Sequence, residues 1–419
     1  MYKKARIYLI SNILTSAIPF ILLPVLTRSL SVEEYGQIAM FQTLLAGFSA
    51  VIGFNGNVSV ERFFYDKHSD NVLREYNDSC FYVLLFSFVV VMLGCYIFDS
   101  TLSSFLSIPI SWIYLTVVIS FLNFIVVFRL GQFQIRKEAF YFGIIQVTGA
   151  LFNVLLSILF VVFLKYGPKG RIDAIIISSF FMAIISIISL YKDDLVGVFR
   201  VSFFKIKEVL KLGLPLIPHT LGIFLLTAVD RFIINNKLGL DSAGIYMVAV
   251  QLSMTLSMIF DAVNKAIVPW LFEELNNKST NKYLIVKYTY MYFLVLFFIS
   301  IFIFFVGDYF VVLIVGVKYK IAGEIIGWLC LGQIFSGMYL MVTNYLFYAK
   351  KTGKLAMVTI FSGGCNIIFL IIFINYLGLI GAAYAFAFSM FIRFILTWII
   401  SSIYIDMPWF KFKDIVKKR

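Results

Sequence analysis

Residues 288–306 read YTYMYFLVLFFISIFIFFV, a run without a single charged side chain. A helix of about 20 apolar residues spans the hydrocarbon layer of a bilayer. Backbone polar groups have no water to bond there, so a helix is one of the few structures that can cross. We therefore predict a transmembrane helix over residues 284–306. Comparable apolar stretches recur from one end of the chain to the other.

The composition of the whole chain indicates that lipid is its solvent. Of 419 residues, 61% are hydrophobic and 14% are charged, against roughly 45–50% and 25% in a soluble domain. A water-soluble core cannot bury that much apolar surface. The four cysteines show no metal-ligand spacing and are interpreted as small packing residues, so we expect no metal and no cofactor: Cys80, Cys95, Cys330 and Cys365.

Charged residues, Gly and Pro divide the chain into about twelve transmembrane helices, which predicts an all-α integral membrane protein. No connection exceeds roughly 30 residues, which leaves no room for a soluble catalytic domain. The helices are predicted near residues 7–28, 36–57, 79–98, 111–130, 141–164, 174–190, 212–233, 243–268, 284–306, 322–348, 356–376 and 380–403.

The basic residues predict the orientation of these helices. Of the 35 Lys and Arg residues, 26 fall in the terminal segments and the loops of one side, 8 fall on the other side, and Arg393 lies inside the last helix. Because Lys and Arg favour the cytoplasmic side, both termini are predicted to be cytoplasmic. The net charge of +13 is spread over short loops and not gathered on one face, so we expect no nucleic-acid partner.

The two halves of the sequence resemble one another. The segment LSVEEYG at residues 30–36 matches LGLDSAG at residues 238–244, a shift of 208. An even number of helices separates the copies, which predicts a parallel repeat of six plus six helices. We accordingly divide the chain into bundles at 1–200 and 201–404, with a basic cytoplasmic tail at 405–419. Further pairs, in the same order along both halves, are Gln42 with Gln251, Asn55 with Asn264, Lys137 with Lys350, and Asn153 with Asn366.

Three motifs carry a resemblance to a known family: ILTSAIPF at residues 13–20, LTRSLSVEEYG at 26–36 and GLPLIP at 213–218. With them the chain resembles the polysaccharide repeat-unit flippases, or O-antigen transporters, of the multidrug, oligosaccharidyl-lipid and polysaccharide exporter superfamily. The likeness covers the whole chain in length, helix count and repeat. It implies a V-shaped pair of six-helix bundles around a central cavity that faces each side of the membrane alternately.

The resemblance also implies a substrate and a location. The substrate would be undecaprenyl pyrophosphate carrying a short oligosaccharide, moved from the cytoplasmic to the periplasmic leaflet of the bacterial inner membrane for O-antigen or another surface polysaccharide. Membrane lipid would surround the protein, and a polysaccharide polymerase and a chain-length regulator would be candidate partners. Flippases for the cell-wall precursor are similar but usually have two additional helices, which this chain lacks.

Arg393 is the first candidate for binding the pyrophosphate. It lies about twelve residues into the last predicted helix, roughly 18 Å along the axis. A central Arg costs about 2.5–3.5 kcal/mol on insertion scales, so it is expected to face protein or a wet cavity. The planar fork of arginine suits phosphate oxygens. An ion pair between helices is the alternative explanation of its charge.

A second group of candidates shares one face of the eighth predicted helix. Asp261, Asn264 and Lys265 stand at positions i, i+3 and i+4, and Gln251 borders the same face. A local bridge between Asp261 and Lys265 is the simpler interpretation, and substrate contact is the alternative. In the matching stretch of the second helix stands Asn55, for which the simpler role is a hydrogen bond between helices.

Two further basic residues, Arg28 and Arg231, lie near the predicted periplasmic ends of helices. Snorkelling toward the headgroups is their default interpretation, with a substrate role as the alternative. The same default applies to Asp230 beside Arg231. Glu324 opens a helix, where a carboxylate is favourable without any further function.

We predict that the membrane potential drives transport at least in part. A lipid pyrophosphate carries roughly two negative charges, and each charge crossing fully is worth about 2.3 kcal/mol per 100 mV. With the cytoplasm negative, outward movement is favoured. The alternative is proton exchange on a carboxylate, and the candidates for this coupling role are Asp261, Asp230 and Glu324.

Three other functions compete with a flippase. A drug or cation exporter of the same superfamily would need acidic residues in its cavity, and Arg393 disfavours it. A membrane polymerase or glycosyltransferase would ordinarily carry a long external loop or a soluble domain with acid and base carboxylates. A channel would not need the even, parallel repeat. The chain is therefore not expected to be an enzyme.

Overall fold

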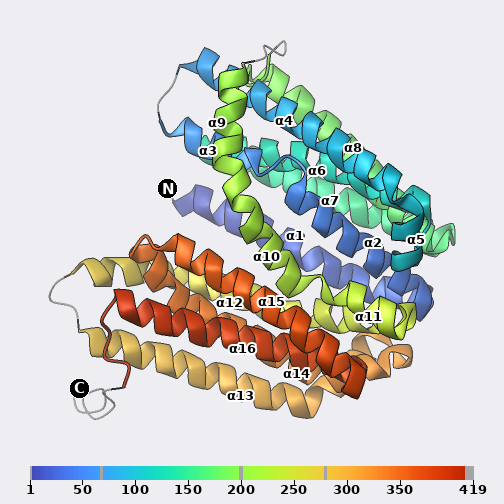
Figure 1. Cartoon of the computed structure of the whole chain (residues 1–419), viewed down its shortest axis with the longest axis vertical. Helices are drawn as coiled ribbons and strands as arrows, with labels where there is room; N and C mark the ends of the chain where they lie inside the picture. Colours follow the sequence, from blue (N-terminus) through green and yellow to red (C-terminus); the bar gives the residue numbers. More distant parts are fainter. Residues whose placement is uncertain (1, 67–68, 198–201, 278–280, 411–419) are drawn as a thin grey trace. The chain divides into compact units, whose positions relative to one another are not determined.

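The computed structural model describes residues 2–66, 69–197, 202–277 and 281–410, and within these ranges it contains helices and no strands (Figure 1). This confirms the all-α prediction. The basic end of the predicted cytoplasmic tail, residues 411–419, lies outside the described residues. Just before it, Met407 and Trp409 are buried against Tyr345.

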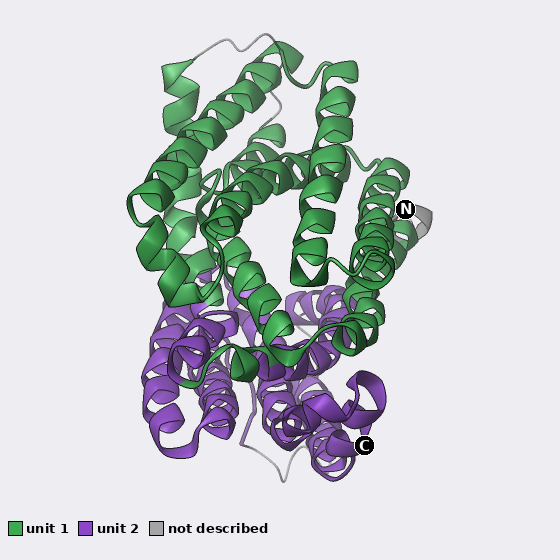
Figure 2. Ribbon diagram, turned by 90° about the vertical axis from the view of Figure 1, so that its right-hand side faces the viewer, with its two compact units in different colours: residues 1–224, 238–244 green, residues 225–237, 245–419 purple. Residues whose placement is uncertain are grey.

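The chain forms two compact units, which are coloured separately in Figure 2. Unit 1 comprises residues 1–224 with 238–244, and unit 2 comprises residues 225–237 with 245–419. The helices of the first half are α1 Tyr2–Ser29, α2 Val32–Val51, α3 Gly56–Phe64, α4 Asp70–Ile97, α5 Asp99–Leu106, α6 Ile110–Ile135, α7 Ala139–Ile158, α8 Gly167–Lys192, α9 Phe203–Gly213 and α10 Ile217–Thr227. Those of the second half are α11 Asp230–Leu238, α12 Leu240–Asn276, α13 Lys282–Val315, α14 Lys320–Tyr348, α15 Thr352–Leu377 and α16 Leu379–Tyr404.

Among the described residues, 11 helices are long and apolar enough to cross a membrane, or up to 12 if the bent pair α2 and α3 forms one span. This confirms the prediction of about twelve spans. Large apolar side chains stand on the outside of these helices, such as Phe305 and Tyr376, each 84% exposed. Lipid is the solvent in which such exposure costs nothing.

The second span is broken, whereas a continuous helix over residues 36–57 was predicted. Gly53, Phe54 and Asn55 all have positive φ, at 81°, 46° and 55°, so the backbone leaves the helical path between α2 and α3. The two helices meet at an angle of 45°. A Cβ atom at Gly53 would lie 2.1 Å from the ring of Phe124. The break therefore requires glycine, both for its φ and for the close approach of α6.

The predicted helix over residues 212–233 is also interrupted. Pro215 lies in a short 3₁₀ turn, η2 (Leu214–Leu216), between α9 and α10. Proline lacks the N–H that a continuous α-helix would use, which explains the change of helix type. The span ends at Thr227, and a separate helix, α11, begins at Asp230.

Helix α8 is one of those that begin earlier than predicted. Residues 174–190 were expected as the sixth span, with Arg171 in the preceding loop, but α8 starts at Gly167. Pro168 stands in the first turn, where proline is well tolerated because that N–H has no partner within the helix. Arg171 is consequently a helical residue inside unit 1.

Similar asparagine–serine contacts occur in the two halves, although the donor differs between them. In unit 1, Asn153 of α7 donates to Ser178 of α8 at 2.7 Å. In unit 2, Ser389 of α16 donates to Asn366 of α15 at 3.1 Å. These are the two asparagines that the sequence comparison paired, and each binds a serine on the following helix.

The matched segments at residues 30–36 and 238–244 lie together in unit 1. A Cβ atom on Gly36 would stand 2.1 Å from the carbonyl oxygen of Leu240. A Cβ atom on Gly244 would stand 2.5 Å from the carbonyl oxygen of Val32. The start of α12 therefore packs backbone to backbone against α2, as small residues allow between membrane helices.

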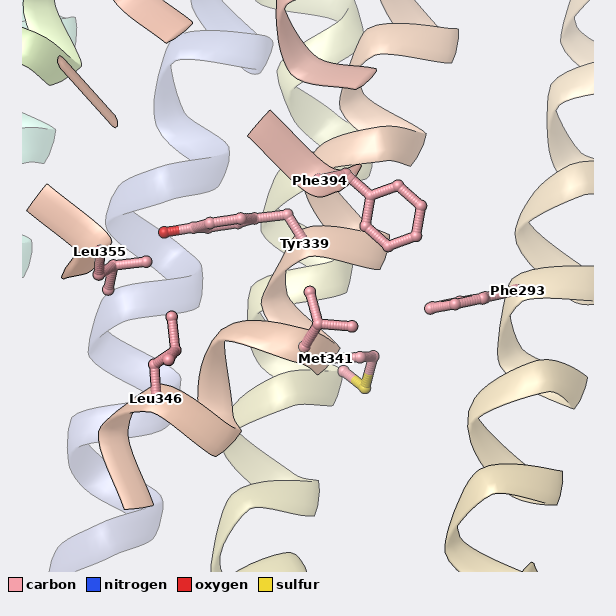
Figure 3. Close-up of a cluster of buried hydrophobic side chains, with 7 residues drawn as sticks. Phe293, Tyr339, Met341, Leu346, Leu355 and Phe394 are labelled. Carbon is pink, nitrogen blue, oxygen red and sulfur yellow. The ribbon is translucent and has the colours of Figure 1, made fainter. Parts of the chain in front are cut away.

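The core of unit 2 surrounds α14. Figure 3 shows Tyr339 of α14 extending between neighbouring helices, with Phe394 of α16 and Leu355 of α15 nearby. Aromatic contacts continue this packing, for example Phe293 against Phe394 at a centroid distance of 5.5 Å. The buried cluster consists of Phe293, Tyr339, Met341, Val342, Leu346, Leu355 and Phe394.

Candidate substrate-binding residues

Arg393 lies on α16 within unit 2 and rests on an aromatic ring. Its guanidinium carbon is 3.9 Å from the centroid of the Tyr339 ring. Its Nη2 donates a long hydrogen bond, of 3.5 Å, to Thr359 Oγ1. Nε is buried and has no hydrogen-bond partner among the described residues.

The ion pair that was the alternative explanation of Arg393 is absent among the described residues, since no carboxylate pairs with its guanidinium. A ring face attracts a cation by its quadrupole, which is worth about 0.5–2 kcal/mol. Stacking of this kind uses the face of the guanidinium and leaves its edge, which carries the N–H donors, free to bind an acceptor. The site therefore holds a charged donor group whose hydrogen-bonding capacity is largely unused.

The candidates on α12 have partners of their own. Lys265 Nζ lies 2.6 Å from Asp261 Oδ2, and both side chains are about half exposed or more, which confirms the local bridge. Asn264 Oδ1 accepts a hydrogen bond from Asn344 Nδ2 of α14 at 2.7 Å. Gln251 is half-buried on the same helix. In the described part of the chain, Asp261, Asn264 and Lys265 bond to one another or to Asn344 and not to Arg393.

Asp230 and Arg231 lie inside the protein and do not snorkel, so that interpretation was wrong for this pair. Their exposed fractions are 2% and 4%. Tyr246 donates to Asp230 Oδ2 at 2.6 Å, and Arg231 Nη1 donates to the carbonyl of Thr227 at 2.8 Å. These bonds tie the first turn of α11 to α10 and α12. By contrast, Arg28 and Glu324 are exposed on α1 and α14.

Asn55 occupies the break between α2 and α3 and borders a pocket of about 410 Å³ within unit 1. Its Nδ2 is buried and has no partner among the described residues. The hydrogen bond between helices that was its simpler interpretation is therefore not made by this atom. The pocket is lined by Ser49, Ile52, Asn55, Asn57, Ser120, Asn123, Phe124, Val126 and Val127.

Sequence reasoning missed Arg171, a second arginine that lines a pocket. The signal that could have found it is the dipeptide Gly167-Pro168, because proline in the first turn marks a helix start. Placing the start there would have put Arg171 inside a span.

Long apolar helices from end to end, and among the described residues an arginine inside a span without a carboxylate partner, define a multi-pass membrane protein. Two solved structures share the fold. The structure of the lipid II flippase MurJ in an inward closed conformation matches with a TM-score of 0.75 and 16% identity, covering 100% of this chain and 90% of that one. An inward-facing multidrug resistance MATE family transporter of the MOP superfamily matches with a TM-score of 0.70 and 15% identity, covering 96% of each chain.

The sequence comparisons place the chain in a family. Residues 1–275 match the polysaccharide biosynthesis protein family, and the chain belongs to that family. A protein of the Lsg locus of Haemophilus influenzae is 27% identical over 372 residues, which covers 86% of this chain and 88% of the relative. The resemblance to a polysaccharide family that was read from the sequence motifs is thereby confirmed.

Proposed function

We propose that this protein flips undecaprenyl-pyrophosphate-linked oligosaccharide repeat units from the cytoplasmic to the periplasmic leaflet of a bacterial inner membrane. The product would supply O-antigen or another surface polysaccharide. The observation that carries the proposal is Arg393, a cation deep in an apolar span that stacks on Tyr339 and has no carboxylate partner among the described residues. Family membership and the flippase fold support the same substrate class.

The chemistry of Arg393 fits a pyrophosphate. Phosphate oxygens accept two parallel hydrogen bonds from one guanidinium, and these charge-assisted bonds are about twice as strong as neutral ones. The contact of the guanidinium carbon with the Tyr339 ring, at 3.9 Å from the centroid, would limit the movement of the group before the substrate arrives. Lys265, which now pairs with Asp261, is a second cation that a phosphate could attract away from its exposed bridge.

The remaining candidates take more modest parts in the proposal. Asn55, Asn264 and Gln251 would offer amide groups to sugar hydroxyls, and exposed Arg28 would meet the substrate or the headgroups near the membrane surface. Arg231 belongs to a buried network with Asp230, so we assign this pair to the stability of α11 and remove both residues from substrate binding and coupling.

Transport by purified protein in vesicles tests the proposal. The vesicles contain labelled undecaprenyl-pyrophosphate oligosaccharide, and an enzyme added outside reports the leaflet that the sugar occupies. We expect protein-dependent movement that speeds up when the potential is negative on the side from which the substrate leaves, because its anionic head then crosses downhill. Asp261→Asn is the control for proton coupling.

Two results would contradict parts of the proposal. If the labelled lipid never changes leaflet while the same vesicles take up a cationic drug, the chain is an exporter of that other class. If movement ignores the potential but follows a pH gradient, and Asp261→Asn removes that response, Asp261 is the coupling residue and potential drive is wrong.

A further inference from the structure

A second arginine lies in a pocket of its own, wholly within unit 1. Arg171 stands in the second turn of α8, and its Nη1 donates to Asn153 Oδ1 at 2.7 Å and to Ser157 Oγ at 2.6 Å, both on α7. Its Nε is buried with no hydrogen-bond partner among the described residues. These contacts hold the guanidinium in one orientation and leave part of its donor edge unused.

No carboxylate of the described residues pairs with this charge. Arg171 forms no ion pair among the described residues, and none of the residues that line its pocket is acidic. A cation inside a membrane span is costly unless it meets an anion or a wet cavity. The uncompensated charge points to a ligand that brings its own negative charge.

The pocket is large enough and polar enough to hold a sugar ring. Its volume is about 360 Å³, at the lower end of the roughly 300–1,000 Å³ of small-molecule sites. Amides line it from three further helices, and one of them, Gln146, has a buried Oε1 without a hydrogen-bond partner in the part of the chain that the structure describes. The lining comprises Gln42, Leu45, Asn123, Val126, Leu130, Ile145, Gln146, Gly149, Ala150, Asn153, Arg171, Ile175, Ser178, Ser179 and Met182.

This lining matches the chemistry of a carbohydrate with one charge. Amide and hydroxyl groups both donate and accept, as sugar hydroxyls require, and the apolar side chains offer a surface to the ring. A single guanidinium balances a single carboxylate, whereas a pyrophosphate would bring about two charges into the same pocket.

We propose that unit 1 binds an acidic sugar, with Arg171 pairing to the sugar carboxylate. The inference rests on the proposed function in one respect: the oligosaccharide that the protein moves would contain a sugar with a carboxylate. Asn153 and Ser157 act as positioning residues, because they hold the guanidinium toward the pocket.

Binding of a pair of simple glycosides to the purified full chain tests the proposal without any transport. The probes are methyl glucuronoside, which has a carboxylate, and methyl glucoside, which has none but is nearly the same size. They are titrated by saturation-transfer NMR in a zwitterionic buffer of low salt. We expect the wild-type protein to prefer the glucuronoside, and Arg171→Gln to weaken its binding about tenfold or more. Arg171→Lys should restore part of the preference.

Controls separate a binding role from a folding role. Gln42 lines the pocket, and the hydrogen bonds of Arg171 among the described residues go to Asn153 and Ser157 instead, so Gln42→Leu should weaken both glycosides and keep the preference between them. Each variant is compared with the wild type by size-exclusion elution and by its melting temperature without ligand.

Three results would overturn the proposal. The first is equal binding of the two glycosides, and the second is unchanged glucuronoside binding in a folded Arg171→Gln protein. The third is chloride binding at the same site as tightly as the glucuronoside, which would make it a site for a small inorganic anion. None of these results contradicts the flippase proposal. Arg393→Ala should leave glucuronoside binding intact, and Arg171→Gln should still move a lipid-linked oligosaccharide whose sugars are uncharged.

Discussion

Arg393 and Tyr339 form a cation–π pair in which the position of each residue accounts for that of the other. The ring stabilises a cation in a span where water is scarce, and the cation gives the ring a role beyond packing in the cluster of Figure 3. The contact joins α16 to α14, so the guanidinium is held by packing as well as by charge. A cation that is held in this way is ready for an anionic ligand without rearrangement.

Substitutions at this pair should separate charge from shape. In the vesicle assay, Arg393→Ala should slow flipping about tenfold or more, because a charged hydrogen bond to phosphate is worth about 1.5–3 kcal/mol. Arg393→Lys should retain part of the rate, because it keeps the charge but loses the planar fork. Tyr339→Phe is the matched control, since it keeps the ring face and should remain near wild type. Full activity in stably inserted Arg393→Ala would contradict the role.

For single residues, the sequence predicted which charged side chains lie within the helices better than it predicted the residues that they contact. Arg393 stands out because it interrupts an apolar run, so its depth could be predicted. Tyr339 could not, because it is far away in the sequence and is one of 24 tyrosines. The burial of Asp230 was also missed, since its partner Tyr246 lies on another helix and only tertiary packing brings the two together.

The break between α2 and α3 depends strongly on one residue, Gly53. Besides its positive φ, Gly53 donates its backbone N–H to Ser87 Oγ of α4 at 2.8 Å. The break thus has a hydrogen bond and a close contact that hold it in place. Asn55 follows at the same bend, where its amide borders the pocket of unit 1.

Gly53→Ala should destabilise unit 1. A side chain at a φ of 81° is strained, and its Cβ would enter the ring of Phe124, so we expect a loss of about 1–3 kcal/mol. Gly94→Ala is the matched control, because a Cβ there meets nothing within 4 Å and its φ is ordinary. Melting temperatures in detergent measure both. If the two variants melt together, the break does not depend on Gly53.

The positions of the apolar spans were predictable, and their ends and interruptions were not. Apolar runs bounded by charges mark a span because both features are local in the sequence. The break at residues 52–55 did have a local signal, the turn-forming residues of GFNGN at 53–57, but these stand in an apolar context that also suits a helix. The packing of Phe124 against the bend decides between the two.

For the whole molecule, the uneven distribution of basic residues yields a prediction of topology. Lys169 and Thr352 are exposed at the starts of α8 and α15, on opposite sides according to the positive-inside rule. In a background without the four native cysteines, an impermeant thiol reagent should label Lys169→Cys in intact cells and spare Thr352→Cys. Labelling after permeabilisation checks that both are reactive. The reverse pattern would place the termini outside the cytoplasm.

The contact of α2 with the start of α12 bears on how the two halves of the sequence can diverge. Gly36 meets Leu240 and Gly244 meets Val32, which is the reciprocal pattern of a two-fold interface between identical subunits. Here both partners belong to one chain, so a substitution changes one side of the contact and not both. Each half of the chain can therefore acquire residues that the other half lacks. At the shift that pairs Asn153 with Asn366, the counterpart of Arg171 is Tyr384 and that of Arg393 is Phe180. The joined halves therefore need not carry the same basic residues, and each has an arginine that the other lacks.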